Sequence, residues 1–225
     1  MKKYIILAVT LLFLVGATSV YAIPTLWISD GIAAPVVIVD ETAGDAFIGT
    51  PGVVSYVGAV GANWLINVVT GVTMPDQGTA IQAYLDLNSI NQTKAGAGTI
   101  SILFSEVGFL GLGSFSLNAG GTVAGVAGSS ATFGAFVDPN NALFVETVGL
   151  GSLGPFGPGA FSGSGSGSYN GLVPFSITLD ANIIHAGKGT SSFDFEAAQV
   201  PEPMSLLLLG SGLLGLGVLS RRIKL

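Results

Sequence analysis

Short stretches in which apolar and polar residues alternate recur along the middle of the chain. In 99–105 the apolar residues Ile100, Ile102 and Phe104 fall on one face of an extended strand, and 174–180 repeats the pattern. Such alternation is typical of half-buried antiparallel strands. Trp64, Ile66 and Val68 repeat it, as do Phe193 and Phe195, and further strands are expected at 25–29, 36–40, 53–57, 81–89, 130–137 and 143–148.

Residues that favour turns separate these segments. They are Ser29-Asp30-Gly31, Pro75-Asp76-Gln77-Gly78, Asn118-Ala119-Gly120-Gly121, Asp138-Pro139-Asn140-Asn141 and Asn170-Gly171. No amphipathic helix pattern lies between them, and the 34 glycines of the chain disfavour long helices. Residues 23–199 are therefore predicted to form an all-β domain, an antiparallel β-sandwich or jelly roll of about ten strands.

The glycine-rich segment 149–168 has two interpretations. It forms either a flexible loop or, in its second half, a strand of small side chains. Serine and glycine alternate from Ser162 to Ser168, so that a strand there would present glycine on one face only. We favour the strand.

The first 22 residues have the three parts of a secretory signal peptide. A basic start precedes an apolar stretch at 4–15, and the small residues Val20 and Ala22 stand at positions −3 and −1 of a cut after Ala22. The apolar stretch is shorter than the roughly 20 residues of a membrane span. We expect residues 1–22 to form a signal-peptide helix that engages the Sec translocon and is removed by signal peptidase.

The segment 200–225 combines three elements in a fixed order. They are the tripeptide Pro201-Glu202-Pro203, an uncharged apolar run at 204–219, and the basic residues Arg221, Arg222 and Lys224. As a helix the apolar run would be about 24 Å long, somewhat shorter than the hydrocarbon core of a bilayer. The basic cluster would keep the C-terminus cytoplasmic, and the two prolines would hold the approach to the membrane extended. The sequence predicts a single transmembrane helix at 204–219.

This tail resembles the PEP-CTERM sorting signal of Gram-negative bacteria. The resemblance implies that the chain is a substrate of exosortase, a membrane cysteine peptidase. It also implies cleavage near Pro201-Glu202-Pro203, after transient anchoring in the inner membrane, and a final location at the cell surface or in the extracellular polymer matrix.

Charge and cysteine content exclude several classes of function. Residues 23–199 contain twelve acidic residues and only two basic ones, Lys94 and Lys188. Such an acidic domain has no electrostatic footprint for nucleic acid. The chain has no cysteine, which excludes disulfides and thiolate metal sites.

Candidate chemistry is sparse. His185 is the only histidine, and no serine lies in the Gly-x-Ser-x-Gly elbow of a hydrolase, so we expect His185 to be a polar residue at the end of a strand. The pattern Gly-x-Gly-x-x-Gly at 149–154 and at 210–215 lacks the strand–helix context of a dinucleotide site. We expect no cofactor.

Four acidic residues near turns are weak calcium candidates: Asp30, Asp40, Glu41 and Asp45. Calcium takes six to eight oxygen ligands, but no EF-hand or repeat motif is present. Turn formation and solvation are the simpler interpretation of these residues.

Three functions remain open. The first is a secreted surface or matrix protein, associated with exopolysaccharide or biofilm, that has no catalytic activity. The second is a carbohydrate- or ligand-binding β-sandwich delivered by the same route, and the third and weakest is a secreted hydrolase. Exposed aromatic residues on one sheet face would favour the second, and the candidates are Trp27, Trp64, Tyr56 and Tyr84, although the alternation at Trp64 points it into the core.

Overall fold

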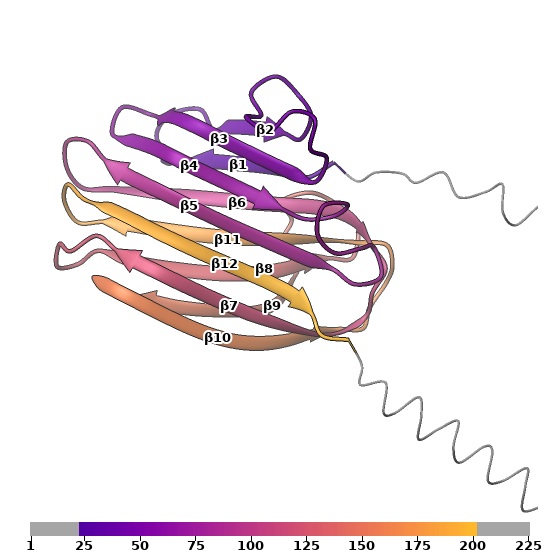
Figure 1. Cartoon of the computed structure of the whole chain (residues 1–225). Coiled ribbons are helices and arrows are strands. Elements are labelled where there is room, and N and C mark those ends of the chain that lie inside the picture. The colour runs from indigo at the N-terminus through magenta and orange to yellow at the C-terminus, as the bar shows by residue number, and fades with distance from the viewer. Residues whose placement is uncertain (1–22, 202–225) are drawn as a thin grey trace, which may run out of the picture.

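The computed structural model describes residues 23–201, which form two packed antiparallel β-sheets (Figure 1). The predicted signal peptide, 1–22, and the predicted transmembrane helix, 204–219, lie outside the described residues. The strands are β1 (Thr25–Ser29), β2 (Val36–Val39), β3 (Val53–Val60), β4 (Trp64–Val72), β5 (Tyr84–Thr93), β6 (Gly98–Phe109), β7 (Gly113–Val123), β8 (Ser130–Asp138), β9 (Val148–Phe156), β10 (Gly159–Tyr169), β11 (Phe175–His185) and β12 (Thr190–Gln199). Within 23–201 no helix is long and apolar enough to cross a membrane.

The last eight strands have jelly-roll connectivity. β5 pairs with β12, β6 with β11, β7 with β10, and β8 with β9, all antiparallel. These four pairs behave as one long ribbon that wraps over itself into two sheets, which is the jelly-roll arrangement. The prediction of an antiparallel sandwich of this kind is confirmed.

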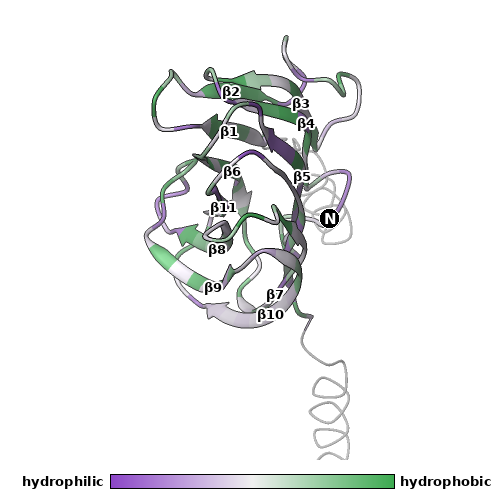
Figure 2. Cartoon of the chain, turned by 90° about the vertical axis from the view of Figure 1, so that its left-hand side faces the viewer, coloured by the Kyte–Doolittle hydropathy of each residue, from purple (hydrophilic) through white to green (hydrophobic). Residues whose placement is uncertain are grey.

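The first four strands widen the two sheets. One sheet, here sheet A, has the order β2-β1-β6-β11-β8-β9, and the other, sheet B, has the order β10-β7-β12-β5-β4-β3. Figure 2 shows the two sheets as layers, with β9 and β10 approaching each other at one edge. The strand count is twelve, instead of the expected ten or so.

The alternating segments face the core as predicted. Ile100, Ile102 and Phe104 of β6 are fully buried, and their strand neighbours on β11 are buried in the same way. Trp64 and Ile66 also point inward, but Val68 does not. A β-bulge between Ile66 and Val68 shifts the pairing of β4 with β5, so that Val69 enters the core and Val68 turns to the outer face.

Two local predictions are wrong, one of a turn and one of a strand. Asn118-Ala119-Gly120-Gly121 is the middle of strand β7 and forms no turn. A side chain at Gly121 would collide with the backbone of Ser192 on β12, so glycine here allows two strands to approach closely. The turn-like composition therefore reflects strand packing.

The segment 143–148 is the second wrong prediction, because β9 begins only at Val148. The preceding residues form a loop that crosses the outer face of sheet A. The Ser176 hydroxyl donates to the Ala142 carbonyl at 2.7 Å, and the Phe144 amide donates to the Ser105 hydroxyl at 3.2 Å. These bonds to polar side chains of the sheet replace the pairing that a strand would have.

The serine–glycine segment is a strand, as we favoured. β10 turns its serines to solvent and its glycines toward β9. A side chain at Gly163 would lie 2.7 Å from the Phe156 ring, and one at Gly167 would overlap the Leu150 carbonyl. Glycine on one face is what allows the edges of the two sheets to close together.

Candidate functional site

The outer face of sheet B carries ordered rows of polar side chains. Strand register aligns Ser164, Asn118, Glu196 and Asp86 across four strands. The next row consists of Ser162, Gly120, Asp194 and Asn88. Neighbouring strands lie about 4.8 Å apart, so the first row is a ladder of hydroxyl, amide and carboxylate groups at regular spacing, and the second row is interrupted only at Gly120. We refer to these two rows as the polar face.

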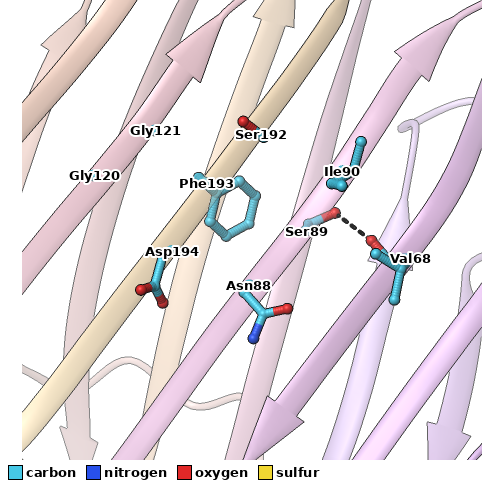
Figure 3. A pocket seen from close by; sticks show the side chains of 9 residues that line it. All are labelled: Val68, Asn88, Ser89, Ile90, Gly120, Gly121, Ser192, Phe193 and Asp194. Atoms are coloured by element: carbon cyan, nitrogen blue, oxygen red, sulfur yellow. Dashed lines mark hydrogen bonds between the residues drawn. The ribbon is translucent and has the colours of Figure 1, made fainter.

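A shallow hollow of about 440 Å³ lies over the second row (Figure 3). Gly120 and Gly121 carry no side chains and leave its floor open. Val68 and Ile90 line one side with apolar surface, while Asn88, Ser192 and Asp194 bring polar groups to it. The hollow thus combines a small apolar wall with convergent hydrogen-bonding groups, a combination found in ligand sites.

The β-bulge in β4 contributes directly to this hollow. Without the bulge, Val68 would continue the alternation of Trp64 and Ile66 into the core. Instead it lies beside Ile90, and its carbonyl accepts a 3.1 Å hydrogen bond from the Ser89 hydroxyl. Alternation alone could not reveal this, because a one-residue bulge reverses every later side chain.

Negative charge is concentrated beside the hollow. The pKa of Asp86 is raised to about 7, mainly because the side chain is buried and also because the Asp194 and Glu196 carboxylates lie close to it. The Tyr84 hydroxyl donates to Glu196 at 3.1 Å, and burial together with that carboxylate raises the pKa of Tyr84. Asn118 donates to the same carboxylate at 3.4 Å. This cluster can accept hydrogen bonds from a polyhydroxylated ligand, and it presents no cation to an anionic one.

The aromatic candidates do not gather on this face. Trp64 is buried, as its alternation predicted, and its ring packs against His185 in a tilted arrangement, with the ring centroids 4.8 Å apart. Trp27 lies on β1 of sheet A, whereas Tyr56 and Tyr84 lie on β3 and β5 of sheet B, and both tyrosine hydroxyls are hydrogen-bonded within the protein. No single face of the described strands gathers these aromatic residues into a stacking platform.

His185 ends β11 and is fully buried. Its Nδ1 lies 3.1 Å from the Thr93 hydroxyl and its Nε2 lies 2.6 Å from the Ser191 hydroxyl. Burial lowers the pKa of His185, which favours the neutral ring. No carboxylate bonds to the ring among the described residues, so the contacts of His185 are those of a buried polar residue at a strand end.

The calcium candidates bind backbone amides. Asp30 accepts from the amides of Ile32 and Ala33 in its own turn. The other three lie in or next to the loop 40–52: Asp40 accepts from Gly52, Glu41 from Gly49, and Asp45 from Glu41, Phe47 and Ser55. Among residues 23–201, no three histidine or acidic side chains are grouped as metal ligands would be.

The predicted processing residues follow the last strand directly. The Gln199 amide donates to the Ala83 carbonyl and the Val200 amide to the Ser114 carbonyl, both at 2.8 Å, and Pro201 is exposed immediately afterwards. The other residues of the predicted tail and signal peptide lie outside the described part of the chain: Glu202, Pro203, Arg221, Arg222, Lys224 and Ala22. No linker separates the sandwich from the tripeptide.

A comparison with protein families matches the PEP-CTERM protein-sorting motif to residues 199–222. The match includes Pro201-Glu202-Pro203 and the first two residues of the basic cluster. The chain therefore carries the sorting signal of exported proteins that exosortase processes. This signal implies export and transient anchoring in a membrane before sorting to the surface. No curated protein matches the chain.

Several solved structures resemble this chain at low sequence identity. The module TmCBM61, in complex with β-1,4-galactotriose, has a TM-score of 0.32 and 9% identity over 60% of this chain and 86% of that one. The C-terminal CBM6 of LamC from Zobellia galactanivorans has a TM-score of 0.28 and 11% identity over 65% and 99%. Tailspike protein 4 of bacteriophage CBA120 has a TM-score of 0.35 and 9% identity over 61% and 20%. At such values the similarity carries no argument about ligand or activity.

Proposed function

We propose that this chain is a secreted surface or extracellular-matrix protein that has no catalytic activity of its own. Sec-dependent export and signal peptidase would deliver it with Ile23 at the N-terminus. The tail would anchor it in the inner membrane until exosortase cleaves near Pro201-Glu202-Pro203. The observation that carries this proposal is the sorting motif at 199–222, which follows the last strand without a linker.

The acidic character of the domain suits such a role. Twelve of the acidic side chains and only two basic ones lie in 23–199, so the released domain repels its own copies and anionic surfaces at neutral pH. Retention in a matrix would then depend on hydrogen bonding and on apolar contact.

A second candidate function is recognition of extracellular polysaccharide through the polar face of sheet B. The hollow supports it, because sugars offer many hydroxyl groups to Asn88, Ser192 and Asp194 and a C–H face to Val68 and Ile90. Without an aromatic platform, such binding would be weak for one site and would depend on several copies along the polymer.

Replacement of Glu202, the central residue of the tripeptide, tests the proposal that the chain is processed at its tail. The variant Glu202→Ala is expected to accumulate uncut in the membrane fraction of the native host, while its circular dichroism stays that of the wild-type domain. Thr99→Ala, an exposed change on β6 far from the tail, serves as the control. Normal maturation of the Glu202 variant would show that this residue is no recognition element.

Affinity electrophoresis with the host exopolysaccharide tests the second. The mature protein is expected to be retarded in the polysaccharide-containing gel, and Asp194→Ala to be retarded less, each relative to its own mobility in a gel without polysaccharide. Equal migration with and without polysaccharide would leave a purely structural role for the domain.

A further inference from the structure

The end of the sandwich from which the tail leaves carries a cluster of exposed apolar side chains. They belong to the loops before β5, between β6 and β7, and between β10 and β11, together with the residue after β12. We call them the exit patch: Ile81, Leu110, Leu112, Leu172, Val173 and Val200. Ile81 and Leu172 are the most exposed, each at 71%.

Hydrogen bonds hold these loops together around the exit. The amides of Leu110 and Gly111 both donate to the Ala80 carbonyl. The Gln199 side chain accepts from the Ala83 amide at 3.1 Å and donates to the Leu112 carbonyl at 2.7 Å. The exit patch is therefore a fixed surface around β12, the last strand of the described residues.

The third loop joins the same surface. Tyr169 at the end of β10 pairs with Gly113 at the start of β7, and its hydroxyl donates to the Leu172 carbonyl at 3.0 Å. The loop 170–174 therefore lies beside 110–112. A set of large apolar side chains exposed at one place on a soluble domain indicates a contact surface.

The basic residues of the domain lie far from the exit patch. Lys94 follows β5 and Lys188 lies in the β11–β12 turn, and both of these positions are at the end opposite the exit patch, as the register of Thr190 with Gln92 requires. They are the only basic residues of 23–201. The exit patch thus has no cationic rim for an anionic partner, and its attraction must be apolar.

Chain length determines how far the exit patch can lie from a membrane. The predicted span begins at Met204, four residues after Val200, whose amide is still bonded to the sheet. Four extended residues reach at most about 14 Å. The headgroup region on one side of the hydrocarbon core is roughly 5–8 Å thick, so a patch on so short a tether lies at the headgroups.

We infer that the exit patch rests on the lipid surface while the tail spans the membrane, and that this contact orients the domain with its opposite end away from the bilayer. The inference rests on the proposed anchoring of the tail. The apolar side chains would enter the headgroup–acyl boundary, as those of interfacial segments do. Because one such contact is weak without the span, cleavage at the tripeptide would release the domain.

The absence of cysteine makes a direct test possible. Single variants Leu172→Cys, in the exit patch, and Ile32→Cys, 92% exposed in the β1–β2 turn at the opposite end, would each carry an NBD fluorophore. The tail-bearing chain, purified from cells that lack exosortase, would be inserted into phosphatidylcholine vesicles. Lipids with a quencher in the headgroup region are expected to quench the probe at position 172 by about twofold more than the probe at position 32.

The outcomes separate this inference from the proposed function. Equal quenching at both positions, in chains that float with the vesicles, would overturn the lipid contact and leave the anchored tail intact. Chains that fail to float would overturn both. A probe at position 172 that is shielded only after exosortase is added would identify the peptidase as the partner of the exit patch, and would overturn the lipid contact.

Discussion

The backbone amide of Val200 donates a 2.8 Å hydrogen bond to the carbonyl of Ser114, one residue before the exposed Pro201. The sheet therefore holds the chain until the predicted processing tripeptide begins. A peptidase that cleaves an extended substrate must approach the end of the sandwich itself, since no spacer carries the tripeptide away from the domain.

Gln199 fixes this junction through its side chain. Gln199→Ala removes bonds to the Ala83 amide and the Leu112 carbonyl, and is expected to lower the free energy of unfolding by about 1–2 kcal/mol. Hydrogen exchange at the Val200 amide should become faster. Gln77→Ala, an exposed change in a nearby loop, should alter neither quantity, and unchanged exchange in the Gln199 variant would contradict the account of the junction.

A second prediction concerns the glycines of β10, which allow this strand to pack closely against β9. Gly167→Ala places a methyl group where it overlaps the Leu150 carbonyl on β9. We expect the free energy of unfolding to fall by about 1–3 kcal/mol, because the two strands must move apart to make room for the methyl group. Ser166→Ala, on the solvent face of the same strand, should be close to neutral. Urea unfolding of both variants gives the comparison, and equal stabilities would show that the edge is loosely packed.

The sequence predicted the strands whose apolar residues alternate without interruption. Ile100 and Ile102 are buried where period two placed them, because each lies in a regular central strand. The serine–glycine strand followed from the same period. In contrast, the outward orientation of Val68 could not be predicted, since a bulge depends on pairing with a strand that is distant in sequence.

The candidate site was missed for the same reason. Gly120 and Gly121 have the composition of a turn, and only the strands on both sides of β7 turn them into the floor of a hollow. Asp86 and Glu196 lie 110 positions apart in sequence and meet through β5–β12 pairing. The tail, whose order of elements is local, was recognisable from sequence alone, and the family comparison confirmed it.

Glu106 makes the stability of the fold depend on pH. It is fully buried, Thr73 donates to it at 2.6 Å, and burial raises its pKa from 4.5 to about 8. Between these two values the folded state retains a proton that the unfolded state has lost, so this group lowers stability as the pH rises. The slope approaches about 1.4 kcal/mol per pH unit within that window.

Glu106→Gln removes the titration and retains an oxygen that can accept the Thr73 bond. Its free energy of unfolding should exceed that of the wild type at pH 8, and the difference should shrink toward pH 5. Urea titrations at the two pH values measure this. A variant that is less stable than the wild type at pH 8 would show that the ionised carboxylate is stabilised by groups that burial alone does not reveal.

The hollow on sheet B can be filled without strain. A Cβ atom at Gly120 would meet no atom closer than 3.8 Å, and the position borders the hollow, so Gly120→Gln should fold normally and occupy the space beside Asp194. Its affinity for host exopolysaccharide is expected to fall about tenfold, a loss of about 1.4 kcal/mol. Gly96→Gln, the same change in an open turn, is the matched control, and equal affinities of the two variants would exclude the hollow as the binding site.

The central claim is that a sorting tail delivers an exported β-sandwich and is then removed. Intact-mass and terminal-peptide mass spectrometry of the protein recovered from its native host tests it most directly. The account predicts an N-terminus at Ile23 and a C-terminus at or near Pro201-Glu202-Pro203. A steady-state chain that still carries 204–225 would contradict it.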